Sequence, residues 1–114
     1  MRYLWALLLV GCGTDTSPPT IHVVNATSNP AQSVYVFWYD SAGGPLLWNE
    51  GFTPGEESCR VPQLGAAFLS VQDAGNIRLE ADVDMRTGQH WLLRATDGPA
   101  GRATVTFTQD EACR

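Results

Sequence analysis

Alternation of hydrophobic and polar residues at every second position is the main pattern after residue 20. It is typical of strands with one buried and one wet face. The segment 77–84 shows it most clearly, because four apolar residues alternate there with one arginine and three carboxylates. The segment 102–108 repeats it, with three threonines on the outward side. No segment carries the stripe of an amphipathic helix. The apolar set predicted to face the core in 77–84 is Ile77, Leu79, Ala81 and Val83.

Glycine, proline and asparagine divide these runs at short intervals. DAGN at 73–76, RTGQ at 86–89 and DGPAG at 97–101 have the length and composition of hairpin turns. The C-terminal half is therefore predicted to be an antiparallel meander. Seven or eight short strands in about 90 residues indicate an all-β fold, a two-sheet antiparallel sandwich. The predicted strands are 20–25, 33–40, 46–49, 57–61, 66–72, 76–84, 90–95 and 102–108.

The first twelve residues, MRYLWALLLVGC, follow a different pattern. One arginine precedes an unbroken apolar run over 3–10, and a small residue stands directly before Cys12. This order is typical of a secretory signal. The run is too short to span a bilayer, which takes about 20 residues as a helix. The alternative is a buried N-terminal strand or helix with a free cysteine.

The quartet LVGC at 9–12 resembles the lipobox of bacterial lipoproteins. The resemblance implies that residues 1–11 are a signal peptide and that Cys12 carries the lipid, so that the membrane is a partner through this anchor. It places the protein in the cell envelope. Because Gly13 and not an aspartate follows the cysteine, it implies the outer membrane in a Gram-negative organism. Residues 12–20 would form the lipidated cysteine and an extended tether, and residues 21–114 the sandwich.

Charge and cysteine content agree with export. The chain has 114 residues, with 12 acidic against 7 basic side chains and a net charge of -5, so nucleic acid and anionic head groups are poor partners. With Cys12 lipidated, Cys59 and Cys113 remain as an even pair, and a disulfide between them is the default in an oxidising compartment. Extended parity places Cys113 inward, near the margin of the core. Two unpaired thiols are the alternative.

The sequence offers no set of residues for catalysis. Only His22 and His90 could serve as an imidazole base, and no serine stands in a GxSxG context. We interpret His22 as a surface or edge-strand residue. No catalytic residue, metal ligand or cofactor is therefore predicted, and a small envelope enzyme or metal-dependent module is the alternative function.

Three carboxylates share the outward face of 76–84, but they spread over about 13 Å, too far for one calcium ion without help from loops. We expect them to be solvated and paired with arginines on neighbouring strands. The carboxylates are Glu80, Asp82 and Asp84, and the arginines with outward parity are Arg78, Arg94 and Arg102.

The segment VYVFWY at 34–39 is apolar on both faces of a strand. Valines suit a sandwich interior and tyrosines tolerate water, so the side with Tyr35, Phe37 and Tyr39 is predicted to be the more exposed. These three residues, with Trp48 as a neighbour, form the candidate surface for an envelope protein, peptide or glycan. The alternative is that the loop 51–57 covers this face.

The N-terminal half also resembles small bacterial immunoglobulin-like domains. The resemblance rests on IHVVNATSNPAQSVYVFWYD followed by GFTPGEESCRVP, an early VxN strand with a later PGE turn. It implies a non-catalytic binding or spacing module. The sequon at Asn25, Ala26 and Thr27 is interpreted as chance, with Asn25 ending the first strand.

Overall fold

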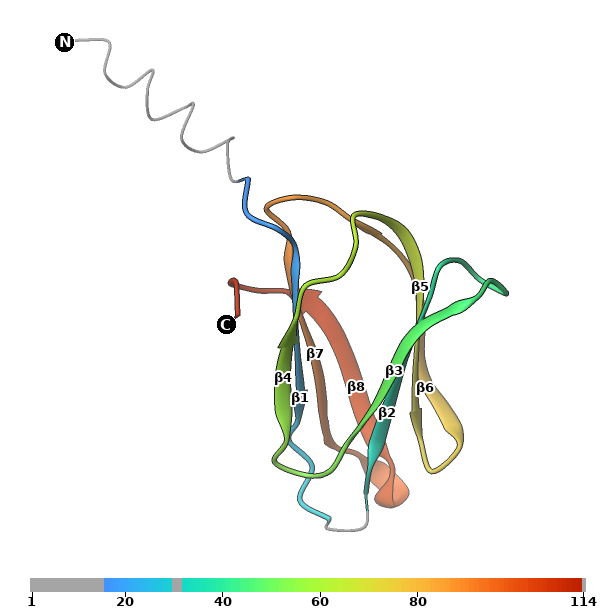
Figure 1. The fold of residues 1–114 in the computed structure, drawn as a ribbon. Helices are drawn as coiled ribbons and strands as arrows, with labels where there is room; N and C mark the ends of the chain where they lie inside the picture. Colours follow the sequence, from blue (N-terminus) through green and yellow to red (C-terminus); the bar gives the residue numbers. More distant parts are fainter. Residues whose placement is uncertain (1–15, 30–31, 114) are drawn as a thin grey trace, which may run out of the picture.

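Two four-stranded sheets stack face to face in the computed structural model, which describes residues 16–29 and 32–113 (Figure 1). The sheet orders are β4-β1-β7-β8 and β3-β2-β5-β6. The predicted all-β sandwich of short strands is confirmed. The strands are β1 (Thr20–Asn25), β2 (Val34–Tyr39), β3 (Leu46–Phe52), β4 (Glu57–Arg60), β5 (Gly65–Asp73), β6 (Asn76–Met85), β7 (His90–Asp97) and β8 (Ala103–Gln109).

The predicted C-terminal meander is wrong at one connection. Strands β5 and β6 form a hairpin, as do β7 and β8, but β6 and β7 lie in different sheets. Met85, only 1% exposed, enters the core at the end of β6, and the turn at 86–89 then carries the chain across to the other sheet. Turn residues such as glycine permit a sharp reversal but do not select the partner strand.

Strand pairing also departs from an immunoglobulin domain and from a wholly antiparallel sandwich. Strands β1 and β7 pair in parallel, whereas the other strand pairs are antiparallel. In the immunoglobulin arrangement the second and third strands belong to different sheets, but here β2 and β3 are hydrogen-bonded neighbours.

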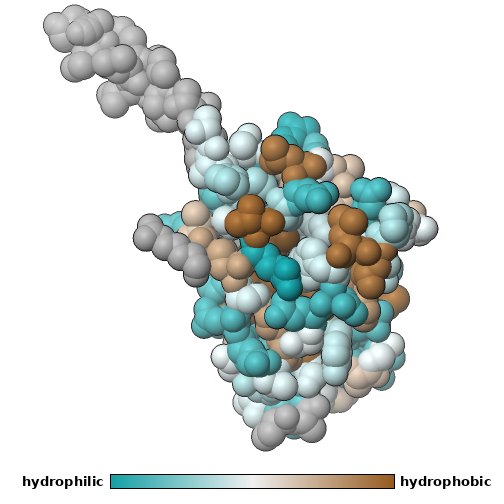
Figure 2. All heavy atoms as spheres, in the orientation of Figure 1, coloured by the Kyte–Doolittle hydropathy of each residue, from teal (hydrophilic) through white to brown (hydrophobic). Residues whose placement is uncertain are grey.

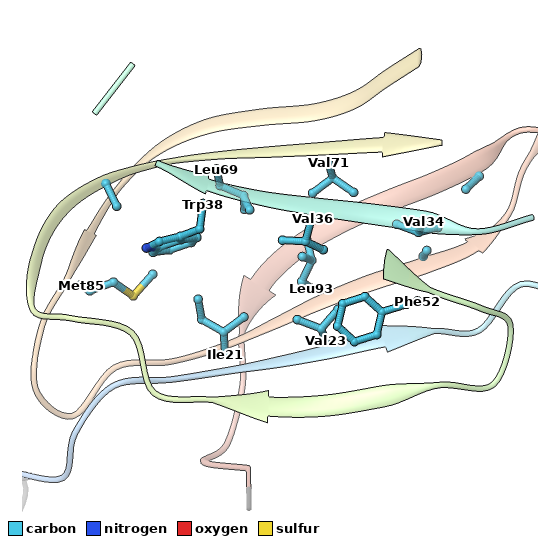
Figure 3. Packing of buried hydrophobic residues seen from close by; sticks show 13 residues of the cluster. Ile21, Val23, Val34, Val36, Trp38, Phe52, Leu69, Val71, Met85 and Leu93 are labelled. Atoms are coloured by element: carbon cyan, nitrogen blue, oxygen red, sulfur yellow. The ribbon is translucent and has the colours of Figure 1, made fainter. Parts of the chain in front are cut away.

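The core lies between the inner faces of the two sheets. Trp38, at 1% exposure, is the largest fully buried side chain, and Val36 lies beside it on β2. Figure 3 shows both pointing toward Ile21 on β1. Burying a side chain of this size contributes about 1.5–3 kcal/mol. Further buried members are Val23, Val34, Phe52, Ala67, Leu69, Val71, Met85, Leu93, Ala95 and Ala103.

A β-bulge reverses one predicted side assignment in β6. Leu79 pairs with Val71 and packs against the core, but the next pair joins Ile77 to Gln72, so Arg78 is the extra residue. Ile77 therefore lies on the outer face, 52% exposed, and its predicted inward position is wrong. A single inserted residue has this effect because side chains in a strand alternate with a period of two.

The sandwich has two ends that differ in structure. We call one end the tether end, because the described chain begins there, within the predicted tether. The turn 86–89 and the loop 61–64 lie at the same end. At the far end are the turns 53–56 and 74–75 and the 3-10 turn Pro99–Gly101. Hydrogen bonds hold the first described residues against the tether end. Gly88 N donates to Ser17 O at 2.8 Å, and His90 is hydrogen-bonded to the hydroxyls of Ser17 and Thr20.

Buried polar side chains hold the far end together. Asn25, 1% exposed, donates to the carbonyls of Gln32 and Phe52 and accepts from Thr27. Asp73 accepts from Gln32 and from the backbone of Ala103. Asn25 ends β1 as predicted. Its burial keeps the sequon amide out of reach of solvent.

Candidate functional site

The outer face of the sheet β3-β2-β5-β6 carries a row of aromatic side chains. Along β2 the residues Val34, Val36 and Trp38 are buried, whereas Tyr35 is 48% exposed and Phe37 and Tyr39 are half-buried. The predicted distribution of the two sides is therefore observed. The physical reason is the strand period of two, which sends successive side chains to opposite faces.

Strand register adds a fourth ring to this row. Phe68 on β5 pairs with Tyr39, and the two ring centroids lie 6.1 Å apart at a tilted angle. We call Tyr35, Phe37, Tyr39 and Phe68 the aromatic face. Phe68 was missed from the sequence because its strand reads as a mixed run, AAFLSVQ, with no aromatic stripe.

Gly51 on β3 makes room for the ring of Tyr35. A Cβ at this position would lie 2.7 Å from Tyr35 Cε2, so a larger residue would displace the ring. The turn that follows β3 is bonded to the end of β1, since Gly55 N donates to Asn25 O and Asn25 N donates to Glu56 O. These bonds hold the turn at β1, in the opposite sheet, and leave the rings of β2 partly open.

A shallow depression of about 290 Å³ lies on the same face. Its wall combines flat apolar groups with hydrogen-bonding ones, because aromatic rings from β2 and β5 meet polar side chains from β5 and β6. The lining residues are Tyr39, Gly43, Phe68, Ser70, Gln72, Ile77 and Glu80.

Trp48 does not belong to the aromatic face. It pairs with Trp38 and stacks on that buried ring, with centroids 5.8 Å apart. Arg60, from the other sheet, lies over the Trp48 ring at 4.1 Å and forms an ion pair with Glu50 at 2.7 Å. The predicted neighbourhood of Trp48 and the tyrosines is therefore wrong, and Trp48 lines a separate depression of about 190 Å³ at the sandwich edge with Leu47.

The carboxylates of β6 border the aromatic face. Glu80 and Asp82 pair with Ser70 and Phe68 across the strand, which puts their side chains on the outer face. The expected pairing with arginines of neighbouring strands is wrong: Asp84 pairs with Arg86 at 2.8 Å, and Arg94 lies in the other sheet. Within the described part of the chain, Glu80 and Asp82 have no ion-pair partner, and no group of three or more ligating side chains could hold a metal.

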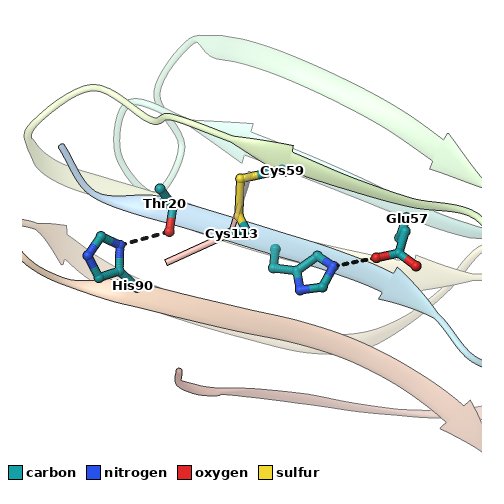
Figure 4. Close-up of a disulfide and its surroundings, with 6 residues drawn as sticks. Thr20, Glu57, Cys59, His90 and Cys113 are labelled. Carbon is teal, nitrogen blue, oxygen red and sulfur yellow. Dashed lines mark hydrogen bonds and ion pairs between the residues drawn. A yellow bond between two sulfur atoms is a disulfide. The ribbon is translucent and has the colours of Figure 1, made fainter. Parts of the chain in front are cut away.

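Both histidines are engaged in hydrogen bonds (Figure 4). His22 contacts Glu57 at 2.7 Å on the outer face of β1, a central strand, so it is a surface residue and not an edge-strand residue. His90 Nε2 lies 3.1 Å from Ser17 Oγ, but its Nδ1 is bonded to the Thr20 hydroxyl at 2.8 Å. A catalytic triad uses a third group, a carboxylate in the usual case, to stabilise the imidazolium, and a hydroxyl does not replace it.

Two carboxylates at the far end have a lowered pKa. The pKa of Asp97 lies below its ordinary value because the backbone N–H and the hydroxyl of Ser28 both donate to it. The pKa of Glu56 is lowered in the same way by the backbone N–H of Thr53. Both groups are exposed. The bond from Thr53 to Glu56 closes a turn, whereas the two bonds from Ser28 to Asp97 tie the loop after β1 to the end of β7.

Cys59 and Cys113 form a disulfide, with their Cα atoms 5.7 Å apart (Figure 4). The expected pairing is confirmed, but its expected place is wrong. Ile21 is buried, so the next residue, His22, faces outward. Cys59 pairs with His22 across the strands and therefore faces outward as well. Beyond β8 the chain leaves the strand, with Asp110 N bonded to His90 O, so strand parity no longer applies to Cys113.

Cys12 and the predicted signal peptide lie outside the described residues. Within 16–29 and 32–113, no helix has the length and hydrophobicity needed to cross a bilayer. The chain matches no protein-family model, and no curated protein or solved structure is significantly similar to it.

Proposed function

We propose that this protein is a lipid-anchored lipoprotein of the cell envelope whose sandwich domain binds a cationic peptide segment of another envelope protein. The observation that carries the proposal is the aromatic face bordered by Glu80 and Asp82, two carboxylates with no ion-pair partner among the described residues. The binding is non-catalytic and needs no cofactor. Envelope glycans are the competing ligand class, and the experiments below distinguish a peptide ligand from a glycan ligand.

The anchor is proposed from Cys12 in its LVGC context. Lipid chains contribute about 0.8 kcal/mol per buried methylene, so an anchor with several chains holds the protein at the membrane. Cys12→Ala should move the protein from the membrane fraction to the soluble fraction. A Cys12→Ala protein that still sediments with membranes would contradict the anchor.

Aromatic rings and carboxylates together favour a cationic ligand. The face of a ring attracts a cation within about 6 Å of its centroid, with a free energy of about 0.5–2 kcal/mol. Glu80 and Asp82 stand on the strand next to Phe68 and contribute negative charge to the same face. An extended peptide with lysine or arginine at alternate positions would place its charged side chains over this face and leave the others in solvent.

Site-specific photo-crosslinking in intact cells tests the surface. A benzophenone amino acid at position 35 should give one dominant adduct, and mass spectrometry should locate it in a segment rich in lysine and arginine. The matched control is position 106, because Thr106 is exposed on the outer face of the opposite sheet. Equal adducts from both positions would contradict a specific surface, and a glycan adduct at position 35 would replace the peptide as ligand.

Charge variants separate ligand contact from folding. Glu80→Gln with Asp82→Asn should lower the yield of the adduct at position 35 several-fold and leave the melting temperature unchanged, because both side chains are exposed. Tyr39→Ala should also lower the yield. Asp110→Asn, an exposed carboxylate beyond β8, is the control and should leave the yield unchanged.

A further inference from the structure

Exposed aliphatic side chains gather at the tether end. Six large hydrophobic residues of the described chain are exposed, and four of them are aliphatic residues at this end. Val61 and Leu64 are the most open, at 64% and 63%. The other two are Tyr35 and Ile77 on the outer sheet face. We call the four residues the hydrophobic rim: Leu46, Leu47, Val61 and Leu64.

Strand register brings the rim to one end, although Leu46 and Leu47 begin β3 and Val61 and Leu64 lie in the loop between β4 and β5. Arg60, directly before Val61, pairs with Ile21 near the start of β1. Gly65, directly after Leu64, pairs with Met85 at the last position of β6. Leu47 and Val61 line the same depression. Figure 2 shows hydrophobic surface concentrated in the half of the visible face nearer to the start of the described chain.

The start of the chain fixes how this end faces the membrane. Ser17 is bonded to Gly88 and His90, so from Ser17 onward the chain is held against this end of the domain. Only three residues separate Cys12 from Thr16, which allows about 14 Å between their Cα atoms at full extension. If Cys12 is anchored as proposed above, the tether end therefore lies within the head-group region or next to it.

We propose that the hydrophobic rim inserts into the interface of a zwitterionic lipid bilayer and orients the domain on it. The rim side chains are aliphatic and uncharged, which suits the boundary between head groups and acyl chains. Two arginines lie at this end, and both are paired with carboxylates, Arg60 with Glu50 and Arg86 with Asp84; the net charge of the chain is -5. Attraction to anionic lipids is therefore excluded as the driving force, and apolar burial remains.

Chemical anchoring tests the rim without relying on cellular lipidation. The chain from residue 12 is coupled through the Cys12 thiol to a maleimide lipid in phosphatidylcholine vesicles, with Cys59 and Cys113 kept as the disulfide. A reference sample is coupled to maleimide polyethylene glycol. We expect amide hydrogen exchange over 61–65 to be about three- to tenfold slower on vesicles than in the reference. Exchange at the far-end turn 74–75 should be unchanged.

Matched substitutions assign the protection to the rim. Val61→Ser with Leu64→Ser should abolish it, whereas Ile77→Ser, an exposed aliphatic residue on the outer sheet face, should preserve it. Unchanged exchange on vesicles, equal slowing in the polyethylene glycol sample, or protection at 74–75 would each overturn the proposal. The coupling bypasses the cell, so these results are independent of the fractionation of Cys12→Ala protein.

Discussion

The two ends of the sandwich are held by different interactions. At the far end, buried polar side chains such as Asn25 and Asp73 satisfy the backbone groups of turns and strand ends. Toward the tether end, the Cys59–Cys113 bond ties the chain after β8 to β4, and the His90 ring is hydrogen-bonded to the hydroxyls of Ser17 and Thr20. The first end has its polar groups directed inward, and the second leaves aliphatic side chains in solvent.

We expect the far end to contribute mainly to the stability of the fold and the hydrophobic rim mainly to contact with the membrane. An apolar side chain exposed to water contributes little to folding, whereas a buried hydrogen-bonded amide costs free energy when it is removed. Substitutions at the far end should therefore change the free energy of unfolding. Substitutions at the hydrophobic rim should change contact with the membrane and leave that free energy within about 0.5 kcal/mol.

The largest expected effect is the loss of the disulfide. Its sequence separation is 54, and the chain-entropy relation values such a loop at about 4 kcal/mol. Cys59→Ser with Cys113→Ser should lower the free energy of unfolding by about this amount, measured by urea denaturation without reductant. Reduced wild-type protein should match the variant. An unchanged midpoint would show that the far end alone sustains the fold.

Next in size is the removal of the buried amide at the far end. Asn25→Ala should destabilise the domain by about 3 kcal/mol, because the carbonyls of Gln32 and Phe52 and the donors of Thr27 lose their partner. Asn49→Ala, at an exposed strand position, is the control and should stay within about 0.5 kcal/mol. Equal effects of the two variants would remove the distinction between the ends.

A gain of stability is expected in the turn at 74–75. Ala74 has φ 52°, a left-handed conformation that asparagine tolerates better, and Gly75 follows at φ 82°. Ala74→Asn should raise the free energy of unfolding by about 0.5–1 kcal/mol. Ala42→Asn, in an exposed loop near the tether end, should give no gain in the same thermal melts.

The smallest effect is a pH dependence at the far end. Because the two bonds from Ser28 lower the pKa of Asp97 in the folded state, the ionised form contributes stability above about pH 4. This contribution is lost as the pH falls through the lower folded pKa. Asp97→Asn should therefore flatten the dependence of the urea midpoint on pH below about pH 4. Asp40→Asn should retain the wild-type slope, and an identical slope in Asp97→Asn would contradict the assignment.

Local pattern predicted much of the architecture. The alternation in 34–39 was enough to separate the buried Val36 from the exposed Tyr35, because strand geometry fixes the side of each residue from its neighbours. The even number of cysteines that remains when Cys12 is set aside was likewise enough to predict the pair Cys59 and Cys113. The first prediction depends only on local strand geometry, and in the second each cysteine has only one available partner.

The tertiary structure alone decided where these strands go. The turn at 86–89 crosses between sheets, the bulge at Arg78 turns Ile77 outward, and Trp48 stacks on Trp38 and not beside the tyrosines. Each of these depends on which distant strand supplies the hydrogen bonds and the space. A turn sequence encodes a reversal but not a partner, and one bulged residue inverts every side assignment beyond it. The sequence by itself determined the strands and most of their faces, and the competition among long-range contacts determined the sheets, the side of Ile77, the aromatic face and the hydrophobic rim.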